Sequence, residues 1–436
     1  MLFTNKKKTL SGYFGTDPNK NLVVPDGLTE IGLGTFIGKK LKSISFNGAT
    51  LNNINIQAFQ SSSIESISLP SSLSSIGREC FANCVNLKTV TFDRNSPLTV
   101  ISMKCFENCK LLENIILPSS ITTIQEYAFS GCSKIGDIGL SSTQISNIDT
   151  YAFKNSGITI LDNAHNEITF GYGSFYESSI ETITFRTVTI PSNCFFGCSS
   201  LTSINIVSVD TIEDSSFENC VSLAAFVIPS SLRIVKSFAF RSCLSLSSVT
   251  LSIDSHIDQI YGGAFINCPN LQSIKLDSKD NRYRFSNGAL TNYEETNLIT
   301  FIPSSRIDTY IVPVTMTSIG NYAFMSCPNL VRVLFSGNSI QTIGRESFKD
   351  CPKLSFLYVT SSSLTSIGES AFDGSPLLCR CGSVRCDKNK RDMFISKGIP
   401  TISFKVDCSY AGGSCGHNPT LISNLSPILI TPLIVM

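Results

Sequence analysis

One pattern of apolar and polar positions repeats along most of the chain. One unit opens with Leu87, Val90 and Phe92, apolar residues separated by polar ones, and this alternation predicts a short strand with one buried face. In many units a second apolar pair follows the strand, such as Leu73 with Ile76, and then a motif of the form A-F-x-x-C. Each unit is therefore expected to hold two short strands and one aromatic turn.

The phenylalanine of this motif sets the period. It recurs fourteen times, at Phe36, Phe59, Phe81, Phe106, Phe129, Phe153, Phe175, Phe195, Phe217, Phe240, Phe265, Phe324, Phe348 and Phe372. The spacing is nearly constant, apart from one long gap between Phe265 and Phe324. A fixed period of this kind is typical of a solenoid, whose units bury their apolar faces only by stacking. We predict a mostly β, right-handed solenoid of about 15 coils.

Most cysteines follow the phase of the repeat. The residue before each phenylalanine is small, and in some units it is a cysteine, such as Cys80. Nine cysteines lie three residues after a phenylalanine: Cys84, Cys109, Cys132, Cys198, Cys220, Cys243, Cys268, Cys327 and Cys351. The C-x-x-x-C spacing of Cys80 and Cys84 would also suit metal or redox chemistry, but only the repeat phase accounts for all nine positions. We therefore expect a ladder of buried free thiols that faces the core.

Composition and charge restrict the classes of function that this protein can have. The chain of 436 residues is 42% hydrophobic and 15% charged, with a formal net charge of +1, so it lacks the basic surface expected of a nucleic-acid binder. Its three histidines, His165, His256 and His417, stand in unrelated contexts. The sequence contains no glycine-rich phosphate loop, zinc-protease helix or nucleophile elbow. We predict that the protein is not an enzyme and holds no cofactor or metal ion.

The repeats resemble a known family. The stretch I-E-S-I-S-L-P-S-S-L-S-S-I-G-R-E-C-F-A-N-C, from Ile64 to Cys84, looks like the BspA-type leucine-rich repeat, and the resemblance covers about residues 20–376. A degenerate double unit, Arg284–Pro313, also looks like a family element. Members of this family are surface antigens of bacteria and of parasitic protists. The resemblance implies a cell-surface location, adhesion to host or matrix proteins, and no catalytic residues.

A second group of cysteines breaks the ladder near the C-terminus. Five of them follow the last repeat: Cys379, Cys381, Cys386, Cys408 and Cys415. The C-R-C opening resembles the disulfide-bonded cap that closes extracellular leucine-rich repeat solenoids, although the tryptophan usual in that cap is absent. The resemblance implies that four of the five form two bridges and one stays free. Such bridges would indicate an oxidising compartment.

The two ends of the chain give conflicting indications of its location. The apolar end LISNLSPILITPLIVM has sixteen residues, interrupted by Pro427 and Pro432, and is shorter than the roughly 20 residues that span a bilayer. Small residues from Ala411 to Ser414 precede it, as in a cleaved lipid-anchor signal; a truncated membrane span and a disordered end are the alternatives. The first residues contain no apolar run long enough for a signal peptide, which leaves three alternatives: unconventional export, a misassigned start codon or a cytosolic protein.

One group of outward-facing side chains is a candidate binding site. The third and fifth positions of each strand pattern should project from the concave face, because strand side chains alternate. Along most coils these positions are small or polar, but in the last two they are Arg332 and Leu334, then Phe356 and Tyr358. An exposed aromatic and apolar cluster with an arginine is typical of a protein-binding hot spot. The alternative is that the C-terminal segment folds back and covers these residues.

These observations lead to one prediction of organisation and two of function. We expect an N-terminal end at residues 1–18, a solenoid at 19–376 with a degenerate segment at 277–313, a cysteine-rich cap at 377–416 and an apolar tail at 417–436. The favoured function is a cell-surface or extracellular protein that binds a host or matrix protein, with membrane attachment through the tail. The alternative is a cytoplasmic scaffold whose repeats bind a partner protein.

Overall fold

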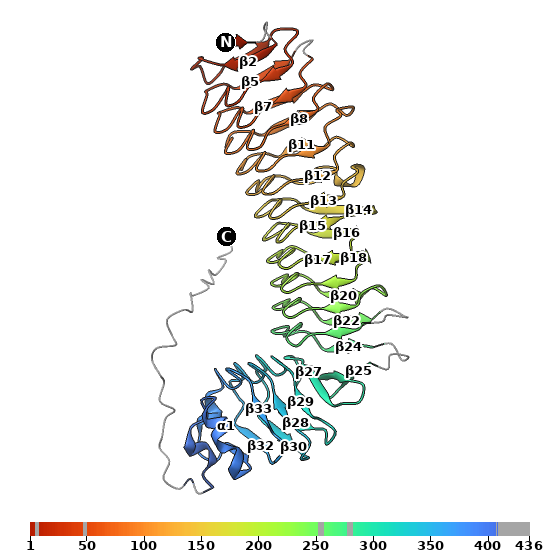
Figure 1. Ribbon diagram of the computed structural model, residues 1–436, viewed down its shortest axis with the longest axis vertical. Helices are drawn as coiled ribbons and strands as arrows, with labels where there is room; N and C mark the ends of the chain where they lie inside the picture. The colour runs from red at the N-terminus through yellow and green to blue at the C-terminus, as the bar shows by residue number, and fades with distance from the viewer. Residues whose placement is uncertain (5–7, 47–49, 252–256, 277–281, 407, 409–436) are drawn as a thin grey trace, which may run out of the picture.

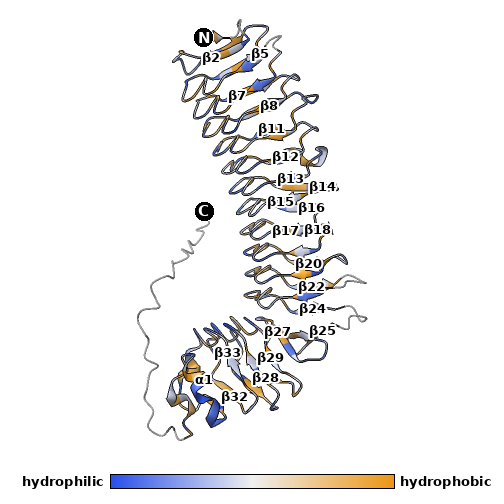
Figure 2. Ribbon diagram, in the orientation of Figure 1, coloured by the Kyte–Doolittle hydropathy of each residue, from blue (hydrophilic) through white to orange (hydrophobic). Residues whose placement is uncertain are grey.

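The computed structural model is a single solenoid, and it describes residues 1–4, 8–46, 50–251, 257–276, 282–406 and 408. The fold is mostly β, with about 16 turns. Figure 1 shows the coils stacked along one long axis, which turns where β25 and β27 lie. In Figure 2 hydrophobic and hydrophilic residues alternate within each coil. The predicted fold class is therefore confirmed.

Most coils contribute one strand to a series of parallel sheets; the described coil between β11 and β14 has no strand of this series and holds the short helix η1 (Leu140–Ser142) instead. Neighbouring coils pair residue for residue, as in Ser66 opposite Thr89 and Ile67 opposite Val90. The strands of this series are β3 (Asn21–Val24), β5 (Ser43–Phe46), β7 (Ser66–Leu69), β9 (Thr89–Phe92), β11 (Asn114–Ile116), β14 (Ile160–Glu167), β16 (Thr182–Arg186), β18 (Ser203–Ser208), β20 (Ala225–Ile228), β22 (Ser248–Leu251), β24 (Ser273–Lys275), β28 (Thr309–Val312), β30 (Arg332–Phe335), β32 (Phe356–Val359) and β34 (Val384–Cys386).

A second series consists of two-residue strands. They are β4 (Glu30–Ile31), β6 (Asn53–Ile54), β8 (Ser75–Ile76), β10 (Val100–Ile101), β12 (Thr123–Ile124), β13 (Asn147–Ile148), β15 (Thr169–Phe170), β17 (Thr189–Ile190), β19 (Thr211–Ile212), β21 (Ile234–Val235), β23 (Gln259–Ile260), β29 (Ser318–Ile319), β31 (Thr342–Ile343) and β33 (Ser366–Ile367). Both series bury alternate residues: in β7, Ile67 and Leu69 face the core while Ser66 and Ser68 face outward.

The repeated phenylalanines stack on one another inside the turns. From Phe36 to Phe59 the ring centroids are 4.8 Å apart, and the planes differ by 6°. The backbone N–H of Phe36 donates to the carbonyl of Ala58, the residue before the next phenylalanine, at 2.7 Å. This bond brings the two turns so close that only a small side chain fits beside it, which explains the small residue at that position.

Two residues in each turn adopt the left-handed backbone conformation. Around Phe81 they are Glu79, with φ of 56°, and Asn83, with φ of 60°. The same two positions recur in coil after coil, at two residues before and two residues after the phenylalanine. Side chains branched at Cβ are poorly tolerated there because their second γ substituent adds to the crowding between the side chain and the backbone. None of the coils with a repeat phenylalanine has valine, isoleucine or threonine at either position.

The long gap between Phe265 and Phe324 is filled by an antiparallel insertion. Its strands are β25 (Tyr283–Ser286), β26 (Ala289–Asn292) and β27 (Asn297–Phe301), and β27 then pairs in parallel with β29. Leu290 and Ile299 join the hydrophobic core on the N-terminal side, whereas Leu298 and Phe301 join the core on the C-terminal side. The strands β26 and β27 thus lie between two cores, where the solenoid axis turns in Figure 1.

Phe301 takes the place of a repeat phenylalanine after the insertion. Its backbone N–H donates to the carbonyl of Ala323 at 2.6 Å, and its ring lies 5.2 Å from that of Phe324. Across the insertion the outer turns also meet, since Phe238 contacts Tyr322 at 4.8 Å between ring centroids. A side chain in place of Gly262 would collide with the carbonyl of Asn321, so glycine permits this approach.

Both ends of the solenoid are closed by elements that continue the stack. At the N-terminus, β1 (Leu2–Thr4) pairs with β2 (Thr9–Gly12), and the ring of Tyr13 lies 5.3 Å from that of Phe36. At the C-terminus, Phe394 lies 5.7 Å from Phe372. The short helices there are η2 (Pro376–Cys379), η3 (Lys388–Lys390), α1 (Arg391–Ile395) and η4 (Thr401–Phe404); η1 (Leu140–Ser142) lies within the solenoid.

Candidate protein-binding face

The cysteine ladder is part of the core. All nine ladder cysteines are buried free thiols, as the repeat phase predicts. Each Sγ donates to the carbonyl of the phenylalanine in the preceding coil, as Cys109 does to Phe81 at 3.1 Å. Burial raises the pKa of the Cys109 thiol well above its ordinary value, so the thiol stays protonated. Buried, protonated thiols are poor nucleophiles and poor metal ligands.

Among the described residues, the other side chains that could bind a metal ion do not form a cluster. Within the described residues, no three or more side chains of the kinds that bind metals lie together. His165 is exposed in β14, whereas His256 and His417 lie outside the described residues.

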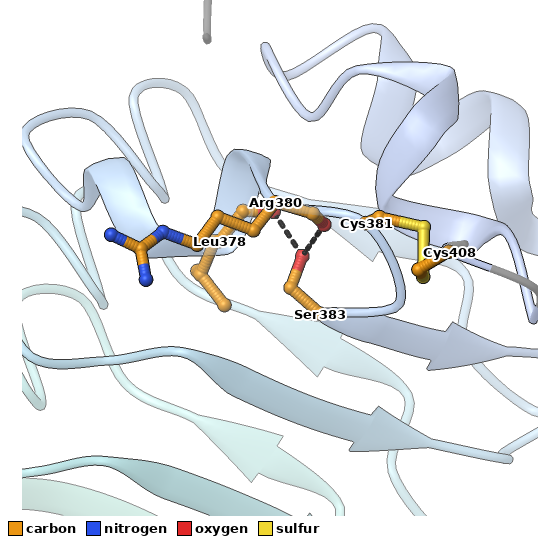
Figure 3. Close-up of a disulfide and its surroundings, with 5 residues drawn as sticks. All are labelled: Leu378, Arg380, Cys381, Ser383 and Cys408. Carbon is orange, nitrogen blue, oxygen red and sulfur yellow. Dashed lines mark hydrogen bonds between the residues drawn. A yellow bond between two sulfur atoms is a disulfide. The ribbon is translucent and has the colours of Figure 1, made fainter. Parts of the chain in front are cut away.

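The cap contains one disulfide. Cys381 is bonded to Cys408, with the two Cα atoms 5.7 Å apart (Figure 3). Cys379 and Cys386 are half-buried free thiols, and Cys415 lies outside the described residues. Burial raises the pKa of Cys386 to about 11. Among the described residues there is thus one bridge, where the resemblance to extracellular caps implied two.

Hydrogen bonds fix the loop that carries Cys381. The hydroxyl of Ser383 donates to the carbonyls of Leu378 and Arg380, the second at 2.7 Å (Figure 3). The next residue, Val384, begins β34, which pairs in parallel with β32. The disulfide loop therefore holds the last strand against the sheet that contains the predicted site.

The four predicted site residues face outward on adjacent strands of this sheet. Arg332 lies opposite Phe356, and Leu334 lies opposite Tyr358. Arg332 is exposed, the Tyr358 side chain is 37% exposed, and Leu334 and Phe356 are half-buried. Two of the four residues are thus exposed and two half-buried, so the described part of the cap covers this face only in part.

The structure adds two residues to this face, which the sequence analysis did not identify. Ile311 of β28 lies opposite Leu334 and is 61% exposed, and Arg385 of β34 lies opposite Tyr358. The Arg385 guanidinium lies over the Phe356 ring, 5.8 Å from its centroid. Ile311 could have been found from the sequence, since it precedes Leu334 by one repeat period, whereas Arg385 lies in the cap, where the repeat no longer indicates a strand. The C-terminal face is defined as Ile311, Arg332, Leu334, Phe356, Tyr358 and Arg385.

Other coils present a different surface. The corresponding outward positions are Ser43 and Ser45, Ser66 and Ser68, Thr89 and Thr91, Ser203 and Asn205, and Ser248 and Thr250. Exposed apolar residues do occur there, such as Val227 in β20 at 60% exposure, but the outward residue on the paired strand is Thr250. Isolated apolar residues are normal on protein surfaces, whereas a contiguous group with arginines is typical of interaction sites.

Parallel coils with an inward leucine-type pattern define a leucine-rich repeat protein. The model of the BspA type leucine rich repeat region matches residues 10–111, 95–189, 188–307 and 291–379, so this chain belongs to that family. Proteins of this family are generally protein-interaction scaffolds, and no enzymatic family is indicated. No curated protein matches the chain.

Several solved structures are similar to the chain. A leucine-rich repeat protein from Bacteroides ovatus is 24% identical, with 58% of this chain and 78% of that chain covered and a TM-score of 0.36. A leucine rich cell surface protein from Faecalibacterium prausnitzii is 20% identical, with 86% and 78% covered and a TM-score of 0.41. The pneumococcal vaccine antigen PcpA is 16% identical, with 88% and 68% covered and a TM-score of 0.25.

The described residues include no helix that is long and apolar enough to cross a membrane. The predicted attachment segment, residues 417–436, lies outside the described residues.

Proposed function

We propose that this protein is a non-enzymatic binding protein of the cell surface, and that its C-terminal face binds a host or matrix protein. The observation that carries the proposal is the C-terminal face itself, where aromatic, aliphatic and arginine side chains are contiguous on four paired strands. Such residues dominate protein–protein binding energy because they bury large areas and still form directed polar contacts.

The supporting strands make this face suitable for binding. Inward residues on the same strands, Val333 and Leu357, are fully buried, so the backbone that presents the outward residues is fixed by the core. A side chain held on a fixed strand loses little conformational freedom when a partner binds, which favours affinity. The face therefore combines exposure with a rigid support.

The disulfide supports a location outside the cytoplasm. Disulfides persist in oxidising compartments and are rare in the cytosol. Cys381 and Cys408 are bonded, and the thiols that remain free in the solenoid are buried where oxidants have little access. The two free thiols of the cap, Cys379 and Cys386, instead favour the alternative of a cytoplasmic scaffold. Surface labelling of intact cells separates the two locations, since a cytoplasmic protein would be protected from the label.

The binding site is tested with a double substitution, Phe356→Ser with Tyr358→Ser. Wild-type and variant proteins are immobilised and exposed to a panel of purified extracellular-matrix proteins, and the melting temperature of each is measured. Val227→Ser is the matched control, because it also removes an exposed apolar side chain from an outward strand position. The proposal requires that the double variant lose binding at an unchanged melting temperature. Retained binding with a clear drop in melting temperature would instead assign the two rings to internal packing.

A further inference from the structure

The C-terminal face carries two positive charges that no described acidic side chain neutralises. Arg332 and Arg385 take part in none of the ion pairs formed among the described residues. The nearest acidic residue in sequence to Arg385 is Asp387, and its carboxylate is engaged at the start of η3, where it accepts from the Asn389 N–H at 2.9 Å. An arginine without an intramolecular acidic partner is available to bind a carboxylate, and its planar guanidinium can do so through two hydrogen bonds.

The strand register fixes the distance between these two arginines. Arg332 lies opposite Phe356 on β32, and Arg385 lies opposite Tyr358, two residues further along the same strand. The arginines are therefore offset by two strand spacings across the sheet and by two residues along it. With about 4.8 Å between strands and about 3.3 Å per residue, their Cα atoms are about 12 Å apart. Phe356 and Tyr358 lie near the midpoint of the line that joins them.

We infer that the C-terminal face binds an extended acidic segment of its partner, in which two carboxylates four residues apart flank an apolar residue. An extended chain covers about 13 Å in four residues, which matches the separation of the arginines. Residues at positions one, three and five of such a segment point to the same side. Both carboxylates then meet guanidinium groups while the central apolar side chain lies over Phe356 and Tyr358. This inference rests on the proposed function and names the chemistry of the partner.

The remaining side chains of the face suit the same segment. Leu334 and Ile311 extend the apolar surface past the central contact, away from Arg385. The Arg385 guanidinium is already held over the Phe356 ring, so its orientation is partly fixed before a carboxylate arrives. Pairing with a carboxylate close to apolar side chains excludes water and strengthens the electrostatic attraction.

The test uses labelled peptides and the full chain. The probe peptide has the core D-S-L-S-D between glycine–serine flanks, and its charge-reversed counterpart has K-S-L-S-K. Binding is measured by fluorescence polarisation at low and at physiological salt. The wild-type protein should prefer the acidic peptide, and either Arg332→Glu or Arg385→Glu should weaken binding roughly tenfold. The double variant should prefer the basic peptide. Arg94 is an exposed arginine far from this face along the solenoid, and Arg94→Glu is the control, which should change the binding of neither peptide.

Spacing variants of the peptide test the geometry. Peptides whose carboxylates are two or six residues apart should bind more weakly than the peptide with a separation of four residues, since only a separation of four matches the distance between the two arginines. Equal binding of the acidic and basic peptides, or no binding of the acidic peptide at about 1 mM, would overturn the inference. Failure of this inference can be distinguished from failure of the proposed function. If the Phe356 and Tyr358 substitutions abolish binding to a matrix protein but the arginine reversals do not, the site stands and the acidic segment is wrong.

Discussion

Replacing Cys84 with serine is expected to make the stability of the protein less sensitive to alkaline pH. The Cys84 thiol is buried and donates to the carbonyl of Phe59 at 2.9 Å. Burial raises its pKa from the ordinary value of 9.0 to about 11. Between these two values the thiol ionises in the unfolded chain and remains protonated in the folded one. Rising pH therefore favours the unfolded chain across this window.

The size of the effect follows from the shift. A group whose pKa is raised by folding leaves stability unaffected below its unfolded pKa, and the free energy of unfolding then falls as pH rises toward the folded pKa. Each pKa unit corresponds to about 1.4 kcal/mol. The loss for Cys84 is therefore about 1.4 kcal/mol at pH 10 and about 2.7 kcal/mol above pH 11. Serine does not ionise in this range, so the variant escapes this loss.

Serine is a suitable replacement because the repeat already uses it. At the equivalent position of a later coil, the Ser375 hydroxyl donates to the carbonyl of Phe348 at 2.6 Å, so serine can replace the thiol hydrogen bond. Cys84→Ala removes both the ionisable group and that bond, and should be less stable than the serine variant at pH 7 by about 1 kcal/mol.

The assay is urea unfolding followed by far-ultraviolet circular dichroism, with a reductant present, at pH 7 and pH 10. All other ionisable groups are shared by the wild type and both variants, so their contributions cancel in the comparison. Both variants should lose about 1.4 kcal/mol less than the wild type between the two pH values. An equal loss in all three proteins would refute the reasoning, because it would mean that the Cys84 thiol ionises equally in the folded and unfolded chains.

Two further predictions concern the C-terminal half. Reduction of the Cys381–Cys408 bridge, which closes a loop with a sequence separation of 27, should cost roughly 3.5 kcal/mol and speed amide exchange in β32 and β33 before β7; uniform exchange along the solenoid would contradict this. Phe301→Ala should cost about 3–5 kcal/mol and split unfolding into two calorimetric transitions, because Phe301 starts the second ring stack; a single unchanged transition would argue against that role.

The period of the phenylalanines was sufficient to predict the coils. It did not identify the aromatic residues that begin the stack of rings at the N-terminus, begin it again after the antiparallel insertion, or end it in the cap. Tyr13 precedes Phe36 by one repeat period, Phe301 precedes Phe324 by one, and Phe394 follows Phe372 by one. All three keep the spacing but lack the surrounding motif. Their neighbours differ because each lies next to a non-repetitive element, where the adjoining surface is a hairpin or the cap. Spacing alone was therefore a stronger signal than the motif.

The candidate site was predicted in part for a related reason. Arg332, Leu334, Phe356 and Tyr358 occur in regular coils, so strand alternation assigned them to the outer face before the structure was known. Arg385 lies in the cap, where the sequence is no longer periodic and β34 is recognisable only from its pairing with β32. Disulfide pairing could not be derived from sequence at all, because several connectivities satisfy the same cysteine spacing.

Inward and outward residues of each strand are subject to different structural constraints, and this difference affects how the chain can evolve. Inward residues and the small residue before each phenylalanine are set by the distance between coils, and the turn positions are restricted by their left-handed backbone. The outward residues of the same strands contribute little to either requirement, since β7 carries serines where β32 carries aromatic rings. Mutations at those positions should therefore be nearly neutral for folding. The outward residues can therefore change during evolution, and with them the ligand that is bound, while the inward residues and the turns of the coils stay the same.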